Sequence, residues 1–335
     1  MKHGPLALTL GDPAGVGPEI ILKSWSALRG AGPAFVVVGD FEALASASGA
    51  GASVVRRVTS PSEALKVFPE AVPVLDRPLR AEVVAGHPSP AAAEAIVDWI
   101  ETAVGLALSG AVRGVVTAPI SKAPLYAAGF KFPGHTEFLG ELTAAAPVAG
   151  ARGPVMMLAA PGLRVSLVTV HEPISRVAGA LSIERIVHVA RVTAEALKAD
   201  FGVETPRLAL AGLNPHAGED GGIGREEIEI VAPAARRLRA EGVDIVGPLP
   251  ADTMFPAEMR ARYDAAVCLY HDQALIPIKM LDFWGGVNVT LGLPIVRTSP
   301  DHGTAFDIAG RGVARADSLI AAIRLADEIA ARRLS

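Results

Sequence analysis

Two kinds of hydrophobic pattern alternate along almost the whole chain. Short, nearly continuous apolar segments predict strands buried on both faces, and segments whose apolar residues recur every three or four positions predict amphipathic helices. Such alternation is typical of a mainly parallel α/β sheet with helices on both faces. The expected strands lie at residues 5–10, 35–38, 114–117, 155–159, 163–170, 207–211 and 265–270, and the expected helices begin near residue 18 or span residues 41–48, 90–108, 183–199, 226–241 and 316–333.

Composition narrows the class of protein. The chain has 335 residues, of which 50% are hydrophobic and 20% charged, so it is long enough for two lobes and too hydrophobic for general disorder. Its 31 basic and 35 acidic residues give a formal net charge of −4, which offers no electrostatic case for binding nucleic acid. The single cysteine, Cys268, excludes internal disulfides and suits a reducing cytosol.

Neither a membrane segment nor a secretory leader is expected. The longest apolar candidates, residues 91–112 and 154–175, are interrupted by charged residues. The first residues lead directly into an apolar stretch without a small-residue cleavage site. The sequence therefore favours a cytoplasmic protein.

A glycine-rich turn, GDPAGVGPE at residues 11–19, separates the first expected strand from the first expected helix. It has two interpretations, a tight turn with Pro18 at the first helical position or a loop beside a nucleotide or another anion. Its spacing is not that of the G-x-G-x-x-G dinucleotide fingerprint, so the usual Rossmann inference does not apply.

Three histidines share one place in the pattern. His171, His216 and His271 each follow the carboxyl end of an expected strand, where open α/β sheets bind ligands. One such histidine is most often an ordinary hydrogen-bonded residue, but three in equivalent places suggest a three-histidine metal site. No H-E-x-x-H motif accompanies them.

Other polar residues lie where an anionic ligand would bind. His135 and Thr136 stand at an expected helix start, where they belong to an ordinary cap or donate to a phosphate or carboxylate. Lys279, Asn288 and Arg297 fall at or near apolar segments, and they are either surface residues at strand ends or a convergent anion site.

Two long glycine-containing loops complete the candidates. Residues 214–226, NPHAGEDGGIGRE, are too long for a simple turn, and loops of this kind are usually functional. Residues 301–310, DHGTAFDIAG, form a loop that is expected to open a short helix, and the plain interpretation is a cap by Thr304 with Asp307 in the first turn.

Seven motifs carry a family resemblance: GDPAGVGPE, GHTE, VTVHEPI, LNPHAGEDGGIGREE, GPLPADTMF, LYHDQALIPIKML and GVNVTLGLPIVRTSPDHGTAFDIAG. On these motifs, from about residue 8 to residue 312, the chain resembles the 4-hydroxythreonine-4-phosphate dehydrogenases of pyridoxal phosphate biosynthesis. The resemblance implies a two-lobed fold like that of isocitrate and isopropylmalate dehydrogenases. The first lobe would comprise residues 1–125 and 290–335, and residues 126–289 would carry the metal ligands and the dimer contacts.

The resemblance also implies roles for individual residues. The ligands of a divalent zinc, cobalt or magnesium ion would be His171, His216 and His271, with His271 supplied by the neighbouring subunit of a homodimer. The residues that bind the phosphorylated substrate would be His135, Thr136, Lys279, Asn288 and Arg297. The loop that binds NAD or NADP would contain His302, Gly303, Thr304 and Asp307.

The implied activity is oxidation of the C3 hydroxyl of 4-phosphooxy-L-threonine in pyridoxine 5′-phosphate biosynthesis. Three neutral imidazoles leave a metal its full charge and open positions, so the metal would make that hydroxyl more acidic while a hydride leaves to the nicotinamide. The product, 2-amino-3-oxo-4-phosphooxybutanoate, is a β-keto acid that can decarboxylate to 3-amino-2-oxopropyl phosphate. The general base stays open among Asp252, Asp272 and Lys279.

Two alternatives stay open beside this activity. Related dehydrogenases of 4-phospho-threonate or 4-phospho-erythronate would use the same residues, and turnover on amino and hydroxy acids would separate them. A non-catalytic, two-lobed binding protein for a small anion would need neither metal nor nicotinamide, since a fold alone does not fix a function.

Overall fold

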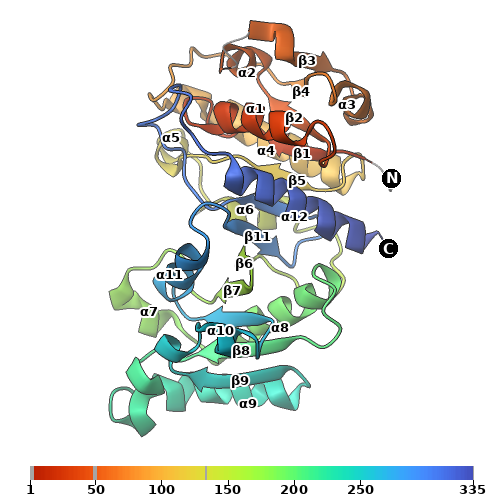
Figure 1. The fold of residues 1–335 in the computed structure, drawn as a ribbon. Coiled ribbons are helices and arrows are strands. Elements are labelled where there is room, and N and C mark those ends of the chain that lie inside the picture. The colour runs from red at the N-terminus through yellow and green to blue at the C-terminus, as the bar shows by residue number, and fades with distance from the viewer. Residues whose placement is uncertain (1–3, 48–50, 133, 335) are drawn as a thin grey trace. The chain divides into compact units, whose positions relative to one another are not determined.

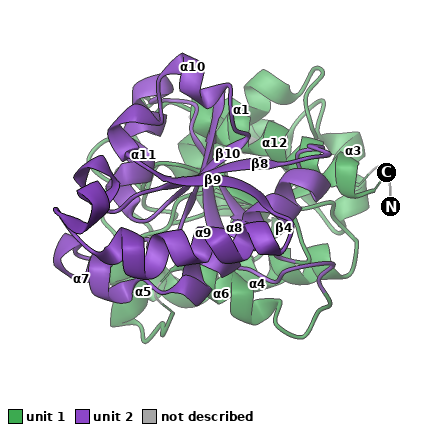
Figure 2. Cartoon of the chain, turned by 90° about the horizontal axis from the view of Figure 1, so that it is seen from below, with its two compact units in different colours: residues 1–147, 294–335 green, residues 148–293 purple. Residues whose placement is uncertain are grey.

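The computed structural model describes residues 4–47, 51–132 and 134–334. The chain forms two compact units, which Figure 2 shows in green and purple: unit 1 comprises residues 1–147 and 294–335, and unit 2 comprises residues 148–293. The first division lies later than the boundary expected after residue 125, because α6 (His135–Leu142) packs against a helix of unit 1. His135 and Thr136 therefore belong to unit 1.

Unit 1 contains a parallel sheet with helices on both faces, as the hydrophobic pattern predicts. Figure 1 shows its first and last helices in front of the sheet and α4 behind it. Its strands lie in the order β3 (Val55–Val58), β4 (Val72–Asp76), β2 (Phe35–Gly39), β1 (Leu6–Thr9), β5 (Val115–Thr117) and β12 (Arg297–Pro300). Its helices are α1 (Gly17–Leu28), α2 (Phe41–Ala47), α3 (Pro61–Val67), α4 (Ala93–Leu108), α5 (Lys122–Ala127), α6 and α12 (Asp317–Arg333), with short 3₁₀ turns at Gly51–Val54 and Pro90–Ala92.

The core of unit 1 explains why its central strands are so uniformly apolar. Strands β1, β2 and β5 are buried at every position, since helices cover both faces of the sheet. Helix α4 contributes the largest fully buried side chain, Trp99, whose indole N–H donates to the carbonyl of Arg77 at 2.9 Å. The indole thus fills the core while its polar atom stays satisfied.

Unit 2 contains a mixed sheet that is parallel except around one strand, because β6 runs antiparallel to both of its neighbours. Its strands lie in the order β11 (Val287–Leu291), β6 (Val155–Ala160), β7 (Leu163–Leu167), β10 (Ala265–Cys268), β8 (Arg207–Ala211) and β9 (Asp244–Leu249). Its helices are α7 (Ile174–Ala180), α8 (Ile183–Ala199), α9 (Ala232–Ala240), α10 (Ala257–Arg260) and α11 (His271–Leu281), with shorter helical turns at Pro215–Gly221, Glu227–Val231 and Ala251–Thr253.

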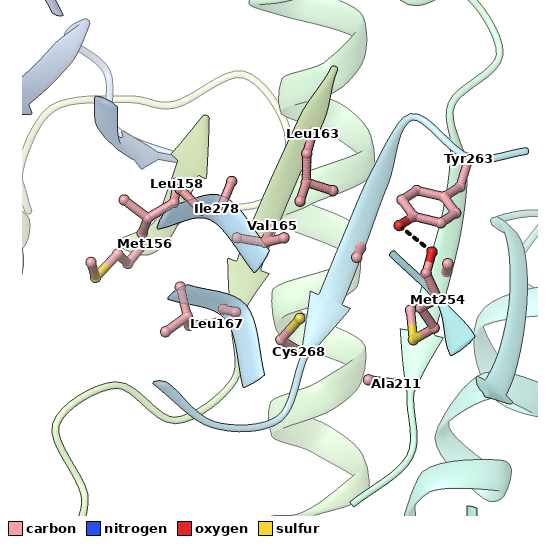
Figure 3. Close-up of a cluster of buried hydrophobic side chains, with 13 residues drawn as sticks. Met156, Leu158, Leu163, Val165, Leu167, Ala211, Met254, Tyr263, Cys268 and Ile278 are labelled. Carbon is pink, nitrogen blue, oxygen red and sulfur yellow. Dashed lines mark hydrogen bonds between the residues drawn. The ribbon is translucent and has the colours of Figure 1, made fainter. Parts of the chain in front are cut away.

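The core cluster of unit 2 joins this sheet to α11. Figure 3 shows Ile278 of α11 beside Val165 of β7 and Leu158 of β6. At the far end of the cluster, the Tyr263 hydroxyl donates to the carbonyl of Met254 at 2.9 Å. This packing fixes α11, the helix that begins at a predicted metal ligand. Among the described residues, no helix has the length and hydropathy needed to cross a membrane.

Candidate active site

A buried arginine is the centre of one polar cluster in unit 1. Arg297 is the first residue of β12 and is only 2% exposed. Its Nη2 donates to the Thr117 hydroxyl at 2.7 Å and lies 3.5 Å from Nδ1 of His135. Burial lowers the pKa of Arg297 to about 10, so the guanidinium remains charged at neutral pH. A buried cation beside the neutral groups of Thr117 and His135 fits an anionic ligand.

The imidazole of His135 adds a neutral donor to this cluster. Burial, and then the positive charges of Arg297 and Lys122, hold the pKa of His135 well below 6.5. Because arginine can only donate, Nδ1 accepts and the neutral ring carries its proton on Nε2. Nε2 is buried and has no hydrogen-bond partner among the residues that the structure describes. The ring can therefore donate to a bound anion.

The amino end of α6, where His135 lies, is not capped by a side chain. Gly134 occupies the N-cap position of α6, and no side chain caps the helix. Thr136 is half-buried in the first turn. The capping interpretation of Thr136 is therefore wrong, and its hydroxyl stands beside His135 at the amino end of the helix.

Two further members of this cluster escaped the sequence analysis. Thr117 ends β5, and Lys122 begins α5 a few residues later. A side-chain carbon added to Gly134 would lie 3.3 Å from Lys122 Nζ, so the ammonium lies beside the start of α6. The signal was present, since Thr117 is the last residue of an expected strand and Lys122 follows that strand.

Two of the three candidate metal ligands lie together in unit 2. The ring centroids of His171 and His271 are 5.7 Å apart, and two imidazoles on one tetrahedral ion would lie about 5 Å apart. Nδ1 of His271 lies 2.7 Å from a carboxylate oxygen of Asp272, which leaves Nε2 to face a ligand. Both rings belong to one chain, whereas the resemblance implies that His271 comes from the neighbouring subunit; imidazole nitrogens suit a borderline divalent cation in either arrangement. Within the described residues, no group of three His, Cys, Asp or Glu residues is placed to hold a metal.

The third histidine, His216, lies on a strained loop. Four non-glycine residues of this loop, His216, Ala217, Glu219 and Asp220, have left-handed φ angles between 45° and 52°. Each costs about 1–2 kcal/mol, and such strain persists where the surroundings over-determine it. The buried carboxylate of Glu227 holds the start of this loop in place. It accepts hydrogen bonds from the backbone N–H groups of residues 213 and 214, both at 2.7 Å.

The remaining candidates of unit 2 occupy three different elements. Lys279 is half-buried in the last turn of α11, with Nζ 5.4 Å from the ring centroid of Phe283. Asn288 lies on β11, and its Oδ1 is buried without a hydrogen-bond partner among the described residues. Asp252 is exposed in the short turn after β9. The predicted substrate residues are thus divided between the two units.

The predicted cofactor loop borders a large cavity within unit 1. Residues 306–312 form consecutive turns, so the short helix expected there is wrong. Thr304 is buried, whereas His302, Gly303 and Asp307 are exposed, and Ala305 has a left-handed φ of 44°. A cavity of about 800 Å³ lies next to the end of this loop, and the described residues that line it include Gly310 but none of the four predicted cofactor residues. Its lining includes Gly310–Gly312, the turn at residues 13–19, and residues that follow β2 and β4.

Comparison with known proteins identifies the family. The model of "Pyridoxal phosphate biosynthetic protein PdxA" matches residues 32–326. A 4-hydroxythreonine-4-phosphate dehydrogenase from Caulobacter vibrioides is 67% identical over 333 residues, which cover 99% of each chain. One from Maricaulis maris is 55% identical over 97% of each chain.

A solved structure agrees with these sequence matches. The 4-hydroxythreonine-4-phosphate dehydrogenase of Klebsiella pneumoniae has a TM-score of 0.85 and 41% identity, and the match covers 98% of each chain. The agreement extends over both units, so it concerns the whole fold rather than one lobe. This chain therefore belongs to the PdxA family of pyridoxal phosphate biosynthetic proteins.

Proposed function

We propose that this chain catalyses the NAD- or NADP-dependent oxidation of the C3 hydroxyl of 4-phosphooxy-L-threonine, in the biosynthesis of pyridoxine 5′-phosphate. The product is 2-amino-3-oxo-4-phosphooxybutanoate, which decarboxylates to 3-amino-2-oxopropyl phosphate. The observation that carries the proposal is the buried Arg297–His135 cluster in a chain 67% identical to a 4-hydroxythreonine-4-phosphate dehydrogenase.

The cluster around Arg297 holds an anionic group of the substrate. The net charge of −4 gives no long-range attraction for a phosphate dianion, so local donors must supply the binding. Arg297 offers a planar fork for a phosphate or carboxylate, and the Nε2 proton of His135 offers a second bond. Thr136, Lys279 and Asn288 complete the substrate-binding set that the family resemblance implies.

The candidate metal site has the donor chemistry of zinc or cobalt rather than magnesium, because imidazole nitrogens suit the former and magnesium prefers oxygen. His171, His216 and His271 would hold the ion. When bound, the ion supplies a Lewis acid that stabilises the developing alkoxide at C3. The Asp272 carboxylate accepts a hydrogen bond from Nδ1–H of His271 and thereby orients the ring, as carboxylates next to metal-bound histidines do.

The engagement of Asp272 bears on the choice of general base. A carboxylate that fixes a ligand is less suited to remove the substrate proton, so we assign Asp272 to orientation. Lys279 and Asp252 then remain as candidates for the base. Lys279 is half-buried, so it is better shielded from bulk water than the exposed Asp252.

The cavity of about 800 Å³ beside residues 301–312 is the proposed site for the nucleotide part of the cofactor. It lies at the carboxyl ends of β1, β2 and β4, where open α/β sheets bind nucleotides. Its volume suits a large ligand, since ordinary ligand pockets measure about 300–1,000 Å³.

A homodimer is proposed from the surface of α11 and the segment after it. Five large apolar side chains there are exposed: Ile276 by 61%, Met280 by 82%, Leu281 by 42%, Phe283 by 60% and Trp284 by 51%. Exposed apolar clusters of this kind mark interaction sites. The occupant is a second copy, because this helix begins at His271, the ligand that the resemblance assigns to the neighbouring subunit.

A biosynthetic role and one buried cysteine suit the cytoplasm.

A substrate panel combined with metal analysis tests the proposed function. The purified protein is assayed for NADH and NADPH formation with 4-phosphooxy-L-threonine, 4-phospho-threonate and 4-phospho-erythronate, before and after removal of metal by a chelator. We expect the highest kcat/KM with the amino acid and a loss of turnover that zinc or cobalt restores. Faster turnover of a hydroxy acid would support the alternative substrates, and no turnover with any of them would contradict the proposal.

A further inference from the structure

The turn at residues 13–19 lines the proposed cofactor cavity, but no role has been assigned so far to the two charged side chains at the start of α1. Two charged side chains of α1, Glu19 and Lys23, lie one helical turn apart, with Lys23 Nζ 2.8 Å from Glu19 Oε1. Glu19 is 8% exposed although it is charged. A carboxylate buried to this degree needs several donors.

Those donors come from the loop that follows β12. The Glu19 carboxylate accepts hydrogen bonds from the backbone N–H groups of Ala314 at 2.8 Å and Gly312 at 3.2 Å. Lys23 Nζ donates to the carbonyl oxygens of the same two residues, at 2.6 Å and 2.9 Å respectively. Glu19 and Lys23 thus bind the N–H and the carbonyl oxygen of both Gly312 and Ala314. A neighbouring β-strand would bind every second residue of the loop in the same way.

The glycine-rich turn holds the same loop at a second point. The N–H of Val16 donates to the carbonyl of Thr304 at 2.9 Å. A side-chain carbon on Gly15 would lie 2.9 Å from that carbonyl oxygen, so only glycine allows this approach. The loop is therefore fixed at residue 304 and again at residues 312 and 314, on either side of Gly310, which lines the cavity.

We propose that Glu19 and Lys23 are positioning residues for the nicotinamide cofactor: they hold residues 310–314 in the shape that forms one wall of the cofactor cavity. The inference rests on the proposed function, because it assumes that this cavity takes the nucleotide. It extends the interpretation of the first glycine-rich motif as a loop beside a nucleotide, because the turn and the start of α1 would also support a second loop that is distant in sequence.

The test separates cofactor binding from substrate binding. In Lys23→Met, the loop keeps its sequence but loses the ammonium that joins two of its carbonyls to Glu19. We expect the Kd for NADH, measured by fluorescence titration without substrate, and the KM for NAD to rise roughly tenfold, the factor for about 1.4 kcal/mol. The kcat and the substrate KM should stay within twofold, and Lys23→Arg should recover part of the affinity.

The matched control is Arg237→Met. It also removes an ion pair between residues one helical turn apart, Arg237 and Glu241 at 3.1 Å, but this pair lies at the end of α9, far from the loop in sequence. This variant should bind NADH like the unmodified protein. An unchanged NADH Kd in Lys23→Met, or an equal rise in the substrate KM, would overturn the inference. If the unmodified protein binds no NADH, the proposed cofactor site fails first, and the inference fails with it.

Discussion

Replacing Arg297 with lysine tests the substrate site most directly, because it keeps the charge and removes only the shape of the donor. In the structure, one nitrogen of the guanidinium, Nη2, serves both Thr117 at 2.7 Å and His135 at 3.5 Å. The planar fork holds a second nitrogen in fixed geometry, so an anion can be bound while these contacts persist. Lysine carries three N–H donors on one nitrogen at the end of a flexible stem, so it cannot present a second nitrogen to the anion in a fixed plane.

The expected magnitude follows from this geometry. One charge-assisted hydrogen bond to the bound anion is lost, and such a bond contributes about 1.5–3 kcal/mol. This free energy corresponds to a rise of about 10- to 150-fold in the substrate KM. The KM for NAD should hardly change, because the proposed cofactor cavity is lined by other residues.

The assay compares both KM values in Arg297→Lys with those of the unmodified protein. Since Arg297 is only 2% exposed, its replacement also perturbs packing, so the melting temperature is measured alongside. Arg207→Lys is the control, because Arg207 pairs with Asp264 at 3.0 Å on the surface of unit 2 and should leave both KM values unchanged. An unchanged substrate KM, or an equal rise in both KM values, would remove Arg297 from the substrate site.

Four further predictions concern the metal, the dimer and the pH. His216→Ala should abolish stoichiometric zinc or cobalt binding and nearly all turnover while leaving the circular dichroism spectrum unchanged; retained metal would refute the assignment. Mixing inactive His171→Ala with inactive His271→Ala subunits should restore part of the activity if the site is shared, since one site of the hybrid is then intact. If the subunits are shown to exchange and no activity returns, the result favours a site built within one chain, where these two rings already lie 5.7 Å apart. Met280→Glu should shift the sedimentation coefficient towards that of a monomer, and an unshifted dimer would place the interface elsewhere. The pKa of His135 is lowered well below 6.5 in the folded protein, so below about pH 6.5 the unfolded chain binds the extra proton and stability falls as the pH falls. The melting temperature should therefore drop less between pH 7 and pH 5.5 in His135→Gln, and an equal drop would show that another group titrates.

The strands that the sequence analysis found and missed differ in how much of their surface is apolar. Strands β1, β2 and β5 are short apolar runs covered on both faces, and the pattern predicts them almost to the residue. Strand β3 has exposed arginines in its middle and lies at an edge of the sheet of unit 1, so its sequence resembles a surface loop. Strand β12 begins with three polar residues yet is fully buried, which hydrophobicity cannot indicate.

The polar residues of β12 are buried because distant groups satisfy them. The Thr298 hydroxyl donates to the carbonyl of Ala322 in α12 at 2.8 Å, and Arg297 donates to Thr117. The cost of burying such groups is offset only by these partners, and nothing local in the sequence announces them. The same limit explains why a short helix was expected in the loop after β12: the loop is instead bonded at Thr304 to Val16, and beyond it at residues 312 and 314 to Glu19 and Lys23 of α1.

The candidate site shows which part of a functional arrangement a single sequence can reveal. The position of a residue after an apolar strand is a local property, and it was enough to single out His171 and His271, whose rings the structure brings together. The Arg297 cluster depends on partners 162 and 180 residues away in the chain, His135 and Thr117. The sequence shows each of these residues only as a polar residue at the end of an element. They converge because the parallel strand order places β5 next to β12, and this brings the buried neutral imidazole beside the buried cation. Substrate binding here therefore depends on the topology of unit 1, and a substitution that weakens the β5–β12 pairing should raise the substrate KM without touching any residue of the cluster.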